Sequence, residues 1–139
     1  MARNTKVFSD LDLSFLPSPG TPNVNGVVGK YDVAKKYDEN AIKQSIRNLV
    51  LTNHYERRFH PEIGSQVSSL LFEPNTPMLN AMLTRAIINT IQNHEPRVVL
   101  MDVQINSNPD NNAVYVSIMF RIVNTTQPVS VKFTLQRTR

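Results

Sequence analysis

Four glutamates are the residues of this sequence whose type and position could support catalysis. They lie near the ends of expected helices or in the connections between elements: Glu56, Glu62, Glu73 and Glu95. Two carboxyl groups about 5 to 10 Å apart could cleave a glycosidic bond, one as an acid and the other as a base or nucleophile. Acids near helix ends are more often caps or solvated charges. We therefore expect no catalytic residue, and a glycosidase is the weaker alternative.

The histidines, serines and glycines show none of the spacings that carry metal, nucleophile or phosphate chemistry. The three histidines form no His-x-x-x-His pair, and no serine lies in a nucleophile elbow. The 139 residues include no cysteine, which excludes disulfides and thiolate ligands. We expect neither a metal nor a cofactor.

The tripeptide Glu95-Pro96-Arg97 places an acid and a base around a proline. It lies where an expected helix ends and an expected strand begins. On local physics alone the two side chains would face water or pair weakly, since an exposed ion pair contributes about 0 to 1 kcal/mol. A contact with a partner protein is the alternative reading of the same residues.

The helix before this tripeptide has the clearest signals of the chain. Thr76 can cap it, Pro77 suits its first position, and it should end near His94 because Pro96 restricts the residue before it. Its apolar residues recur at helical spacing: Leu79, Met82, Leu83, Ala86, Ile87, Thr90 and Ile91.

Two further helices are expected earlier in the chain. The first covers residues 38–51, where Asp38 and Glu39 precede apolar residues at helical spacing. The second is shorter and begins at Pro61 and Glu62. Their apolar residues are, in order, Ile42, Ile46, Leu49 and Val50, then Ile63, Val67, Leu70 and Leu71.

After the tripeptide the hydrophobic period changes from 3.6 to 2, which predicts three strands with one buried face each. The residues expected on the buried faces are Val99, Met101, Val103 and Ile105; Val114, Val116, Ile118, Phe120 and Ile122; and Val129, Val131, Phe133 and Leu135. The connections are short and rich in asparagine and proline, which favours an antiparallel meander.

The sequence therefore predicts an α+β fold in which three helices pack on one face of a small antiparallel meander sheet. An alternating run over residues 7–15 predicts an additional N-terminal extended segment. Residues 16–29 collect prolines, glycines and asparagines and should form a loop or arm. We expect a single domain overall, with the extended segment and arm over residues 1–37 and the α+β domain over residues 38–139.

The charge and hydropathy of the chain argue against two classes of partner. The net charge is +4, but the cations are scattered and not interleaved with aromatic residues, so we expect no nucleic-acid partner. No apolar stretch approaches the roughly 18 to 20 residues of a membrane span, so we expect no membrane contact.

Several motifs in fixed order resemble a known family. They begin with Phe8-Ser9-Asp10 and continue through Arg47-Asn48-Leu49, Glu56-Arg57-Arg58, Phe59-His60-Pro61-Glu62-Ile63-Gly64, Leu71-Phe72-Glu73, Thr76-Pro77 and Glu95-Pro96-Arg97. The ordered set resembles the baseplate wedge proteins of contractile phage tails that initiate the sheath, a family with relatives in type VI secretion. The resemblance covers roughly residues 40 to 136. Tyr55 stands where members of this family often have a glycine.

The resemblance implies a structural role in the virion, in the tail baseplate, with assembly in the host cytoplasm. It implies that Glu95, Pro96 and Arg97 dock on the helical core bundle formed by other wedge proteins, in several copies of a symmetric assembly. It also implies contact with the tail sheath protein. A lysozyme-like label carried by some family members implies peptidoglycan cleavage, which is the rival function.

The expected strand 129–136 supplies a mechanism for the sheath contact. An exposed strand edge can accept a strand of another chain through main-chain hydrogen bonds. Lys132 would guard such an edge against unwanted pairing. The residues of this sheath-facing edge are expected to be Val129, Val131, Lys132, Phe133 and Leu135.

Overall fold

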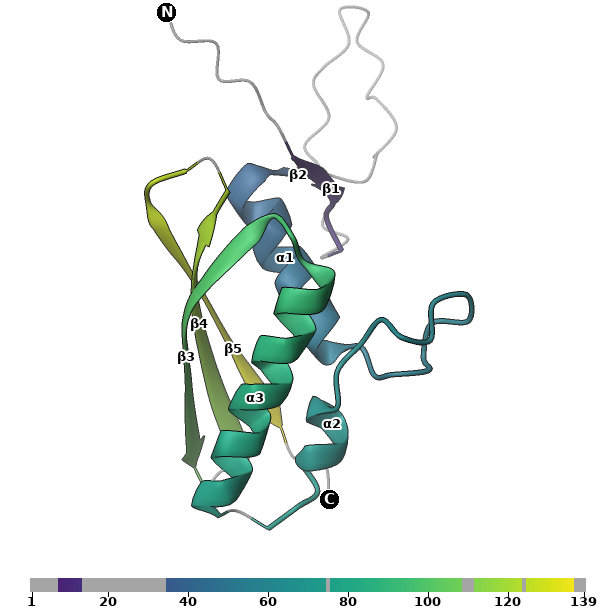
Figure 1. Ribbon diagram of the computed structural model, residues 1–139, viewed down its shortest axis with the longest axis vertical. Helices are drawn as coiled ribbons and strands as arrows, with labels where there is room; N and C mark the ends of the chain where they lie inside the picture. Colours follow the sequence, from purple (N-terminus) through teal and green to yellow (C-terminus); the bar gives the residue numbers. More distant parts are fainter. Residues whose placement is uncertain (1–7, 14–34, 75, 109–111, 124, 137–139) are drawn as a thin grey trace, which may run out of the picture. The chain divides into compact units, whose positions relative to one another are not determined.

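The computed structural model describes residues 8–13, 35–74, 76–108, 112–123 and 125–136 (Figure 1). Its elements are β1 (Ser9–Leu11), β2 (Lys35–Tyr37), α1 (Asp38–Leu51), α2 (Val67–Leu70), α3 (Pro77–His94), β3 (Val98–Asn108), β4 (Ala113–Ile122) and β5 (Pro128–Gln136). The chain divides into two compact units, Met1–Gln44 and Ser45–Arg139, and α1 contributes residues to both. The domain limits expected from the sequence stay a prediction.

The first unit contains a small two-stranded sheet. β1 and β2 pair antiparallel, with Ser9 opposite Tyr37 and Leu11 opposite Lys35. The extended N-terminal segment expected from the sequence is thus confirmed over Ser9–Leu11, whereas β2 was not foreseen. The arm expected over residues 16–29 lies outside the described residues.

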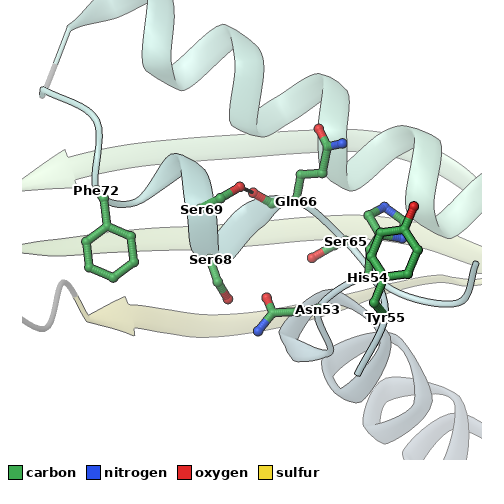
Figure 2. A pocket seen from close by; sticks show the side chains of 8 residues that line it. All are labelled: Asn53, His54, Tyr55, Ser65, Gln66, Ser68, Ser69 and Phe72. Carbon is green, nitrogen blue, oxygen red and sulfur yellow. Dashed lines mark hydrogen bonds between the residues drawn. The ribbon is translucent and has the colours of Figure 1, made fainter. Parts of the chain in front are cut away.

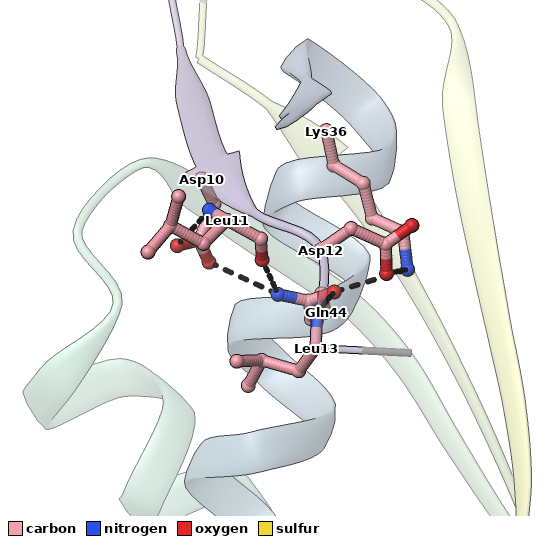
Figure 3. A network of polar contacts seen from close by, with 6 residues as sticks. All are labelled: Asp10, Leu11, Asp12, Leu13, Lys36 and Gln44. Carbon is pink, nitrogen blue, oxygen red and sulfur yellow. Dashed lines mark hydrogen bonds and ion pairs between the residues drawn. The ribbon is translucent and has the colours of Figure 1, made fainter. Parts of the chain in front are cut away.

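Within the first unit, the Gln44 side chain of α1 binds the end of β1 and a lysine of β2 (Figure 3). Its Nε2 donates to the carbonyl oxygen of Leu11 at 2.5 Å, and its Oε1 accepts from Lys36 Nζ at 3.0 Å. Lys36 also pairs with Asp12 at 2.8 Å. At the start of α1 the Asp38 carboxylate accepts from the backbone N–H of Phe8, and the Asp38 N–H donates to the Phe8 carbonyl. The Phe8-Ser9-Asp10 motif is therefore part of a defined structure.

The second unit is built on a three-stranded antiparallel sheet in the order β3-β4-β5, which confirms the predicted meander. β4 is the central strand, and its residues alternate between the core and the opposite face as expected. Val114, Val116, Ile118 and Phe120 are fully or almost fully buried. α3 lies across β3 on the core face (Figure 1).

The predicted face of β3 is wrong in its first half. The register shifts between Leu100 and Asp102, so Met101 is an extra residue in a β-bulge. Because a bulge moves the following side chains to the other face, the core side of the strand carries Leu100 and then Val103, whereas Val99 and Met101 are exposed. A period-two reading of sequence cannot detect one extra residue in an otherwise apolar run.

The limits of α1 and α3 agree with those predicted. The Thr76 side chain caps α3 by accepting from the N–H of Leu79 at 3.3 Å, and Pro77 occupies the first turn. Within α3 the residues Leu79, Leu83, Ile87, Thr90 and Ile91 are buried. Met82 was expected on this apolar stripe and is instead 43% exposed.

The predicted second helix is much shorter than expected. Helical structure begins at Val67, whereas Pro61 and Glu62 lie in a turn. The Ser65 N–H donates to the Thr52 carbonyl at 2.8 Å, which removes it from any helix that starts at Pro61. Gly64 has φ +153, and a Cβ there would lie 2.6 Å from the carbonyl of Asn53. A long-range bridge therefore competes with the local helix signals.

Candidate functional site

The Glu95-Pro96-Arg97 tripeptide forms a tight corner between α3 and β3. The Glu95 N–H still donates to Ile91 as the last helical bond, at 2.9 Å. Pro96 then turns the chain, and the Val98 N–H returns to the Glu95 carbonyl at 3.4 Å, as in a β-turn with proline at its second position. This turn places the side chains of Glu95 and Arg97 on the same side of the corner.

The two side chains form a bidentate ion pair. Arg97 Nε donates to Glu95 Oε1 at 2.6 Å, and Arg97 Nη2 donates to Glu95 Oε2 at 2.7 Å. Ser45 of α1 completes the arrangement, because its hydroxyl donates to Glu95 Oε2 at 2.7 Å and accepts from Arg97 Nη2 at 3.2 Å. We refer to Ser45, Glu95 and Arg97 as the corner network.

The solvated corner favoured by local physics is wrong. Glu95 is 3% exposed, whereas the Arg97 side chain is 33% exposed. The acid is therefore a buried group with hydrogen-bond partners on both carboxylate oxygens, and the base is the member that reaches the surface. A planar guanidinium held at two of its nitrogens by one carboxylate has a fixed orientation.

Ser45 was missed by the sequence reasoning, although the sequence contains a signal for it. It lies four residues after Ala41 and four before Leu49, both buried, so it occupies the apolar stripe of α1. A serine on such a stripe needs a hydrogen-bond partner when the helix is packed. The spacing could have predicted a buried polar partner, but not that the partner is Glu95, far along the chain.

Electrostatics keep the Glu95 carboxyl ionised. Burial raises its pKa, but hydrogen bonds from Arg97 and Ser45, together with the positive charge of Arg97, outweigh burial and leave the pKa below its ordinary value. Glu95 is thus a permanent anion at neutral pH that orients Arg97.

The residues predicted for a sheath-facing edge lie on β5, which is an edge strand of the sheet. Val129, Phe133 and Leu135 are buried on the core face, and Lys132 is exposed on the opposite face. Val131 pairs with Ile118 in the middle of the strand. Among the described strands, the main chain of β5 has a neighbour on one side only, since β3 is the other edge.

Two of the carboxylates considered for catalysis, Glu62 and Glu95, do not show the electrostatics of a general acid. Glu62 is exposed; a backbone hydrogen bond and the contact of its carboxylate with His60 at 3.1 Å lower its pKa. A glycosidase acid needs a raised pKa. The pKa of Glu95 is shifted in the same unfavourable direction.

The described part of the chain contains neither a metal-binding cluster nor a membrane-spanning helix. Its histidines and acids form no group of three that could bind a metal ion. None of its helices is both long and apolar enough to cross a membrane.

A recess of about 570 Å³ lies between the loop that follows α1 and the short helix α2 (Figure 2). Its lining residues are Asn53, His54, Tyr55, Ser65, Gln66, Ser68, Ser69 and Phe72. Sequence reasoning did not predict this recess, because it depends on the bridge between Asn53 and Ser65.

Comparison with known proteins gives one family and several similar structures. The family model of baseplate wedge protein gp25 matches residues 36–127. The baseplate wedge protein gp25 of Enterobacteria phage T4 is 29% identical over 124 residues, which cover 89% of this chain and 86% of that protein.

Two solved structures share the fold at low sequence identity. A protein of Geobacter sulfurreducens that has been suggested to be a tail lysozyme has a TM-score of 0.66 and 18% identity, over 70% of this chain and 89% of its own. A chain of the anti-feeding prophage baseplate, in a six-fold symmetrised structure, has a TM-score of 0.59 and 21% identity, over 91% of this chain and 83% of its own.

Proposed function

The chain belongs to the baseplate wedge protein gp25 family, and from this premise we propose that it docks on the baseplate core through the corner network and initiates the tail sheath through β5. As a family member it is a structural component of contractile tail baseplates. The observation that carries the docking role is the position of the corner network inside the matched residues 36–127. β5 lies beyond that match, so the sheath role rests on its place at the edge of the sheet.

The corner network supports docking because it presents one oriented cation. Arg97 is held by two hydrogen bonds to Glu95 and is the exposed member of the pair. A guanidinium fixed in this way loses little conformational freedom when it meets a carboxylate or a helix carbonyl on a partner. A partner that excludes water would also strengthen the pair.

The docking role is tested with the double variant Glu95→Gln/Arg97→Met. The introduced carboxamide can still accept a hydrogen bond from Ser45, and the methionine removes the cation, so no charge is left unpaired in the corner and the fold should be retained. We expect this variant to unfold at a urea concentration close to that of the wild type yet to be depleted at least tenfold from purified baseplates. Normal incorporation of a folded variant would remove the docking role. Arg121→Met, which removes an exposed cation of β4, is the matched control.

The edge of β5 supports sheath initiation because its main-chain groups can continue the ladder. A strand from a sheath subunit could add beside β5, with the alternating side chains setting its register. Lys132 keeps such an edge from pairing indiscriminately.

Proline substitution tests this strand addition. Neighbouring residues of a strand direct their N–H groups to opposite sides, so one of Val131→Pro and Lys132→Pro removes a donor to β4 and the other a donor at the open edge. The variant that keeps wild-type stability should enter baseplates normally but support no sheath. Sheaths of normal length on baseplates that carry this stable variant would refute strand addition at β5.

The proposed partners are other baseplate wedge proteins and the tail sheath protein, and not nucleic acid or a membrane. We propose that several copies act in a symmetric baseplate of the virion, assembled in the host cytoplasm. The proposed role is not enzymatic. Purified protein incubated with cell walls should therefore release no reducing ends, and release that is lost on substitution of Glu62 or Glu73 would establish the lysozyme-like alternative.

A further inference from the structure

The loop between α1 and α2 is a closed and well-braced structure. The Ser65 hydroxyl is buried and donates to the Val50 carbonyl at 2.6 Å, which joins the two ends of the loop. Nearer its tip the Tyr55 N–H donates to the Pro61 carbonyl at 2.9 Å. In Figure 1 the loop extends away from α3 and the three-stranded sheet. The tip is therefore held in one shape by hydrogen bonds within its own base.

Large aromatic side chains project from this loop and from the end of α2. Tyr55 is 85% exposed, Phe59 is 91% exposed and Phe72 is 77% exposed. Folded domains normally bury such rings, as Phe120 is buried in this sheet. Exposed rings on a braced loop and just after a short helix are typical of a surface that a partner covers.

Tyr55 also adopts a backbone conformation that a tyrosine seldom takes. Its φ is +67, in the left-handed region that favours glycine. This chain therefore presents an exposed ring from a position of the turn that is strained for a tyrosine. Local strain of this kind is retained where the surrounding structure fixes it.

The recess behind this loop is lined by groups that pair with a peptide main chain. Tyr55 and Phe72 lie at its two ends, Asn53 and Ser68 lie between them, and the side chain of Gln66 points toward α3 (Figure 2). Carboxamides both donate and accept, as peptide groups do. The recess thus carries polar groups that can pair with the main chain of an extended segment.

The charge of the loop selects for an acidic occupant. Glu56 accepts from the backbone N–H of Asn53 at 2.8 Å, and Glu62 contacts His60, so both acids have local partners. Arg57 and Arg58 are exposed at the tip, and within the described ranges no carboxylate pairs with them. Two exposed cations beside exposed rings complement carboxylates next to an apolar side chain.

We propose that Tyr55, Arg57, Arg58, Phe59 and Phe72 form a docking surface for an extended acidic segment of another baseplate protein. This surface is distinct from the corner network and from β5. A single-stranded nucleic acid is the less suitable occupant, because two adjacent arginines offer few phosphate contacts and Glu56 and Glu62 would repel the backbone. The identity of the partner as a baseplate protein rests on the proposed function.

The test uses the full chain and fluorescein-labelled peptides, each about 15 residues long, that tile the other virion proteins encoded with it. We expect the peptides that bind, by fluorescence anisotropy, to combine carboxylates with an apolar residue, with dissociation constants below about 100 µM. Arg57→Glu/Arg58→Glu should weaken binding at least tenfold, and so should Phe59→Ser/Phe72→Ser. Arg85→Glu, an exposed charge reversal on α3, should leave binding unchanged.

Three results would overturn the proposal. They are the absence of any bound peptide up to about 1 mM, binding that survives the loop substitutions in folded variants, and displacement of the bound peptides by an oligothymidine of about 15 nucleotides. Glu95→Gln/Arg97→Met separates this surface from the docking corner, since that variant should bind the peptides as the wild type does. Failure of peptide binding therefore leaves the baseplate incorporation result for the corner unaffected.

Discussion

At the scale of single residues, the corner network explains why a buried acid is stable next to a helix end. Burial of the Glu95 carboxylate carries a desolvation cost in free energy. Two hydrogen bonds from Arg97 and one from the Ser45 hydroxyl offset that cost. The same geometry leaves part of Arg97 at the surface. The pair that stabilises the corner is thus the same pair that we propose for docking, so variants must be chosen that keep the fold while removing the exposed cation.

Removal of Arg97 alone should be strongly destabilising. Arg97→Ala leaves the Glu95 carboxylate buried with Ser45 as its remaining side-chain donor, and we expect a loss of about 2 to 3 kcal/mol. This is less than the roughly 3 to 5 kcal/mol of a fully buried pair because Arg97 is partly exposed. Urea denaturation measures the loss. Arg121→Ala should stay within about 0.5 kcal/mol of wild type, and an equal effect of both substitutions would contradict this account.

The same carboxyl makes stability depend on acid pH. Its pKa in the folded state lies below its ordinary value of 4.5, so the unfolded chain binds a proton before the folded one does. The contribution of Glu95 to the free energy of unfolding is therefore complete above about pH 4.5 and is lost as pH falls through the folded-state pKa.

Urea midpoints between about pH 6 and pH 3 provide the measurement for Glu95. We expect the wild type to lose more stability over this range than Glu95→Gln, which has no proton to take up at this position. Asp102→Asn, which removes an exposed carboxylate of β3, is the matched control. A Glu95→Gln curve parallel to that of the wild type would show that the network does not hold the anion.

At the scale of secondary-structure elements, strong local signals in the sequence predict the helix limits correctly. Hydrogen bonds between residues far apart in the chain are not predicted by such signals. α3 has a capping threonine, a proline at its start and a proline after its end, so its limits follow from the sequence. The predicted start of the second helix at Pro61 and Glu62 is wrong. The Ser65 N–H bonds to the Thr52 carbonyl instead, and the backbone at Gly64 lies close to that of Asn53. Such bonds join residues that no local pattern connects.

For the candidate site as well, local sequence signals predict the position in the chain, whereas the long-range contacts are not predicted. The sequence located the tripeptide at a helix-to-strand corner because Pro96 ends one period and the next begins after it. It did not reveal that Glu95 is buried, since that depends on Ser45 in another helix. It also could not reveal which half of β3 is inverted, since Met101 is apolar and fits either face.

The bulge in β3 leads to a prediction about deletions. Removal of Met101 deletes the extra residue and leaves Leu100 and Val103 on the core face with one residue between them. We expect that variant to fold with a loss of at most about 1 to 2 kcal/mol, because a regular ladder replaces the bulge.

Deletion of Gln104 is the matched control for the bulge. Gln104 is also exposed, but it belongs to the regular ladder, and its loss would bring Val103 and Ile105 into adjacent positions on opposite faces. This variant should lose cooperative urea unfolding altogether. Equal tolerance of the two deletions would show that the register is not set by the core face.

At the scale of the whole molecule, the corner network leads into one edge strand of the sheet, and β5 is the other edge strand. The corner leads into β3, and β4 separates β3 from β5. The Val123 N–H, just after β4, donates to the Arg97 carbonyl at 2.9 Å, so the corner is tied to the central strand as well. A partner bound at the corner therefore leaves the main chain of β5 available to another chain.

This separation predicts competition between variants in a mixed assembly. Protein that carries the stable β5 proline still has an intact corner, so in excess it should occupy baseplates and reduce the fraction of sheathed tails in proportion to its share of the mixture. If the β5 proline is combined with Glu95→Gln/Arg97→Met, the excess protein should no longer compete, because it cannot dock. Electron microscopy of tails assembled from defined ratios measures the sheathed fraction. Inhibition by the combined variant would mean that this chain is recruited through neither the corner network nor the open edge of β5, and would refute the docking role.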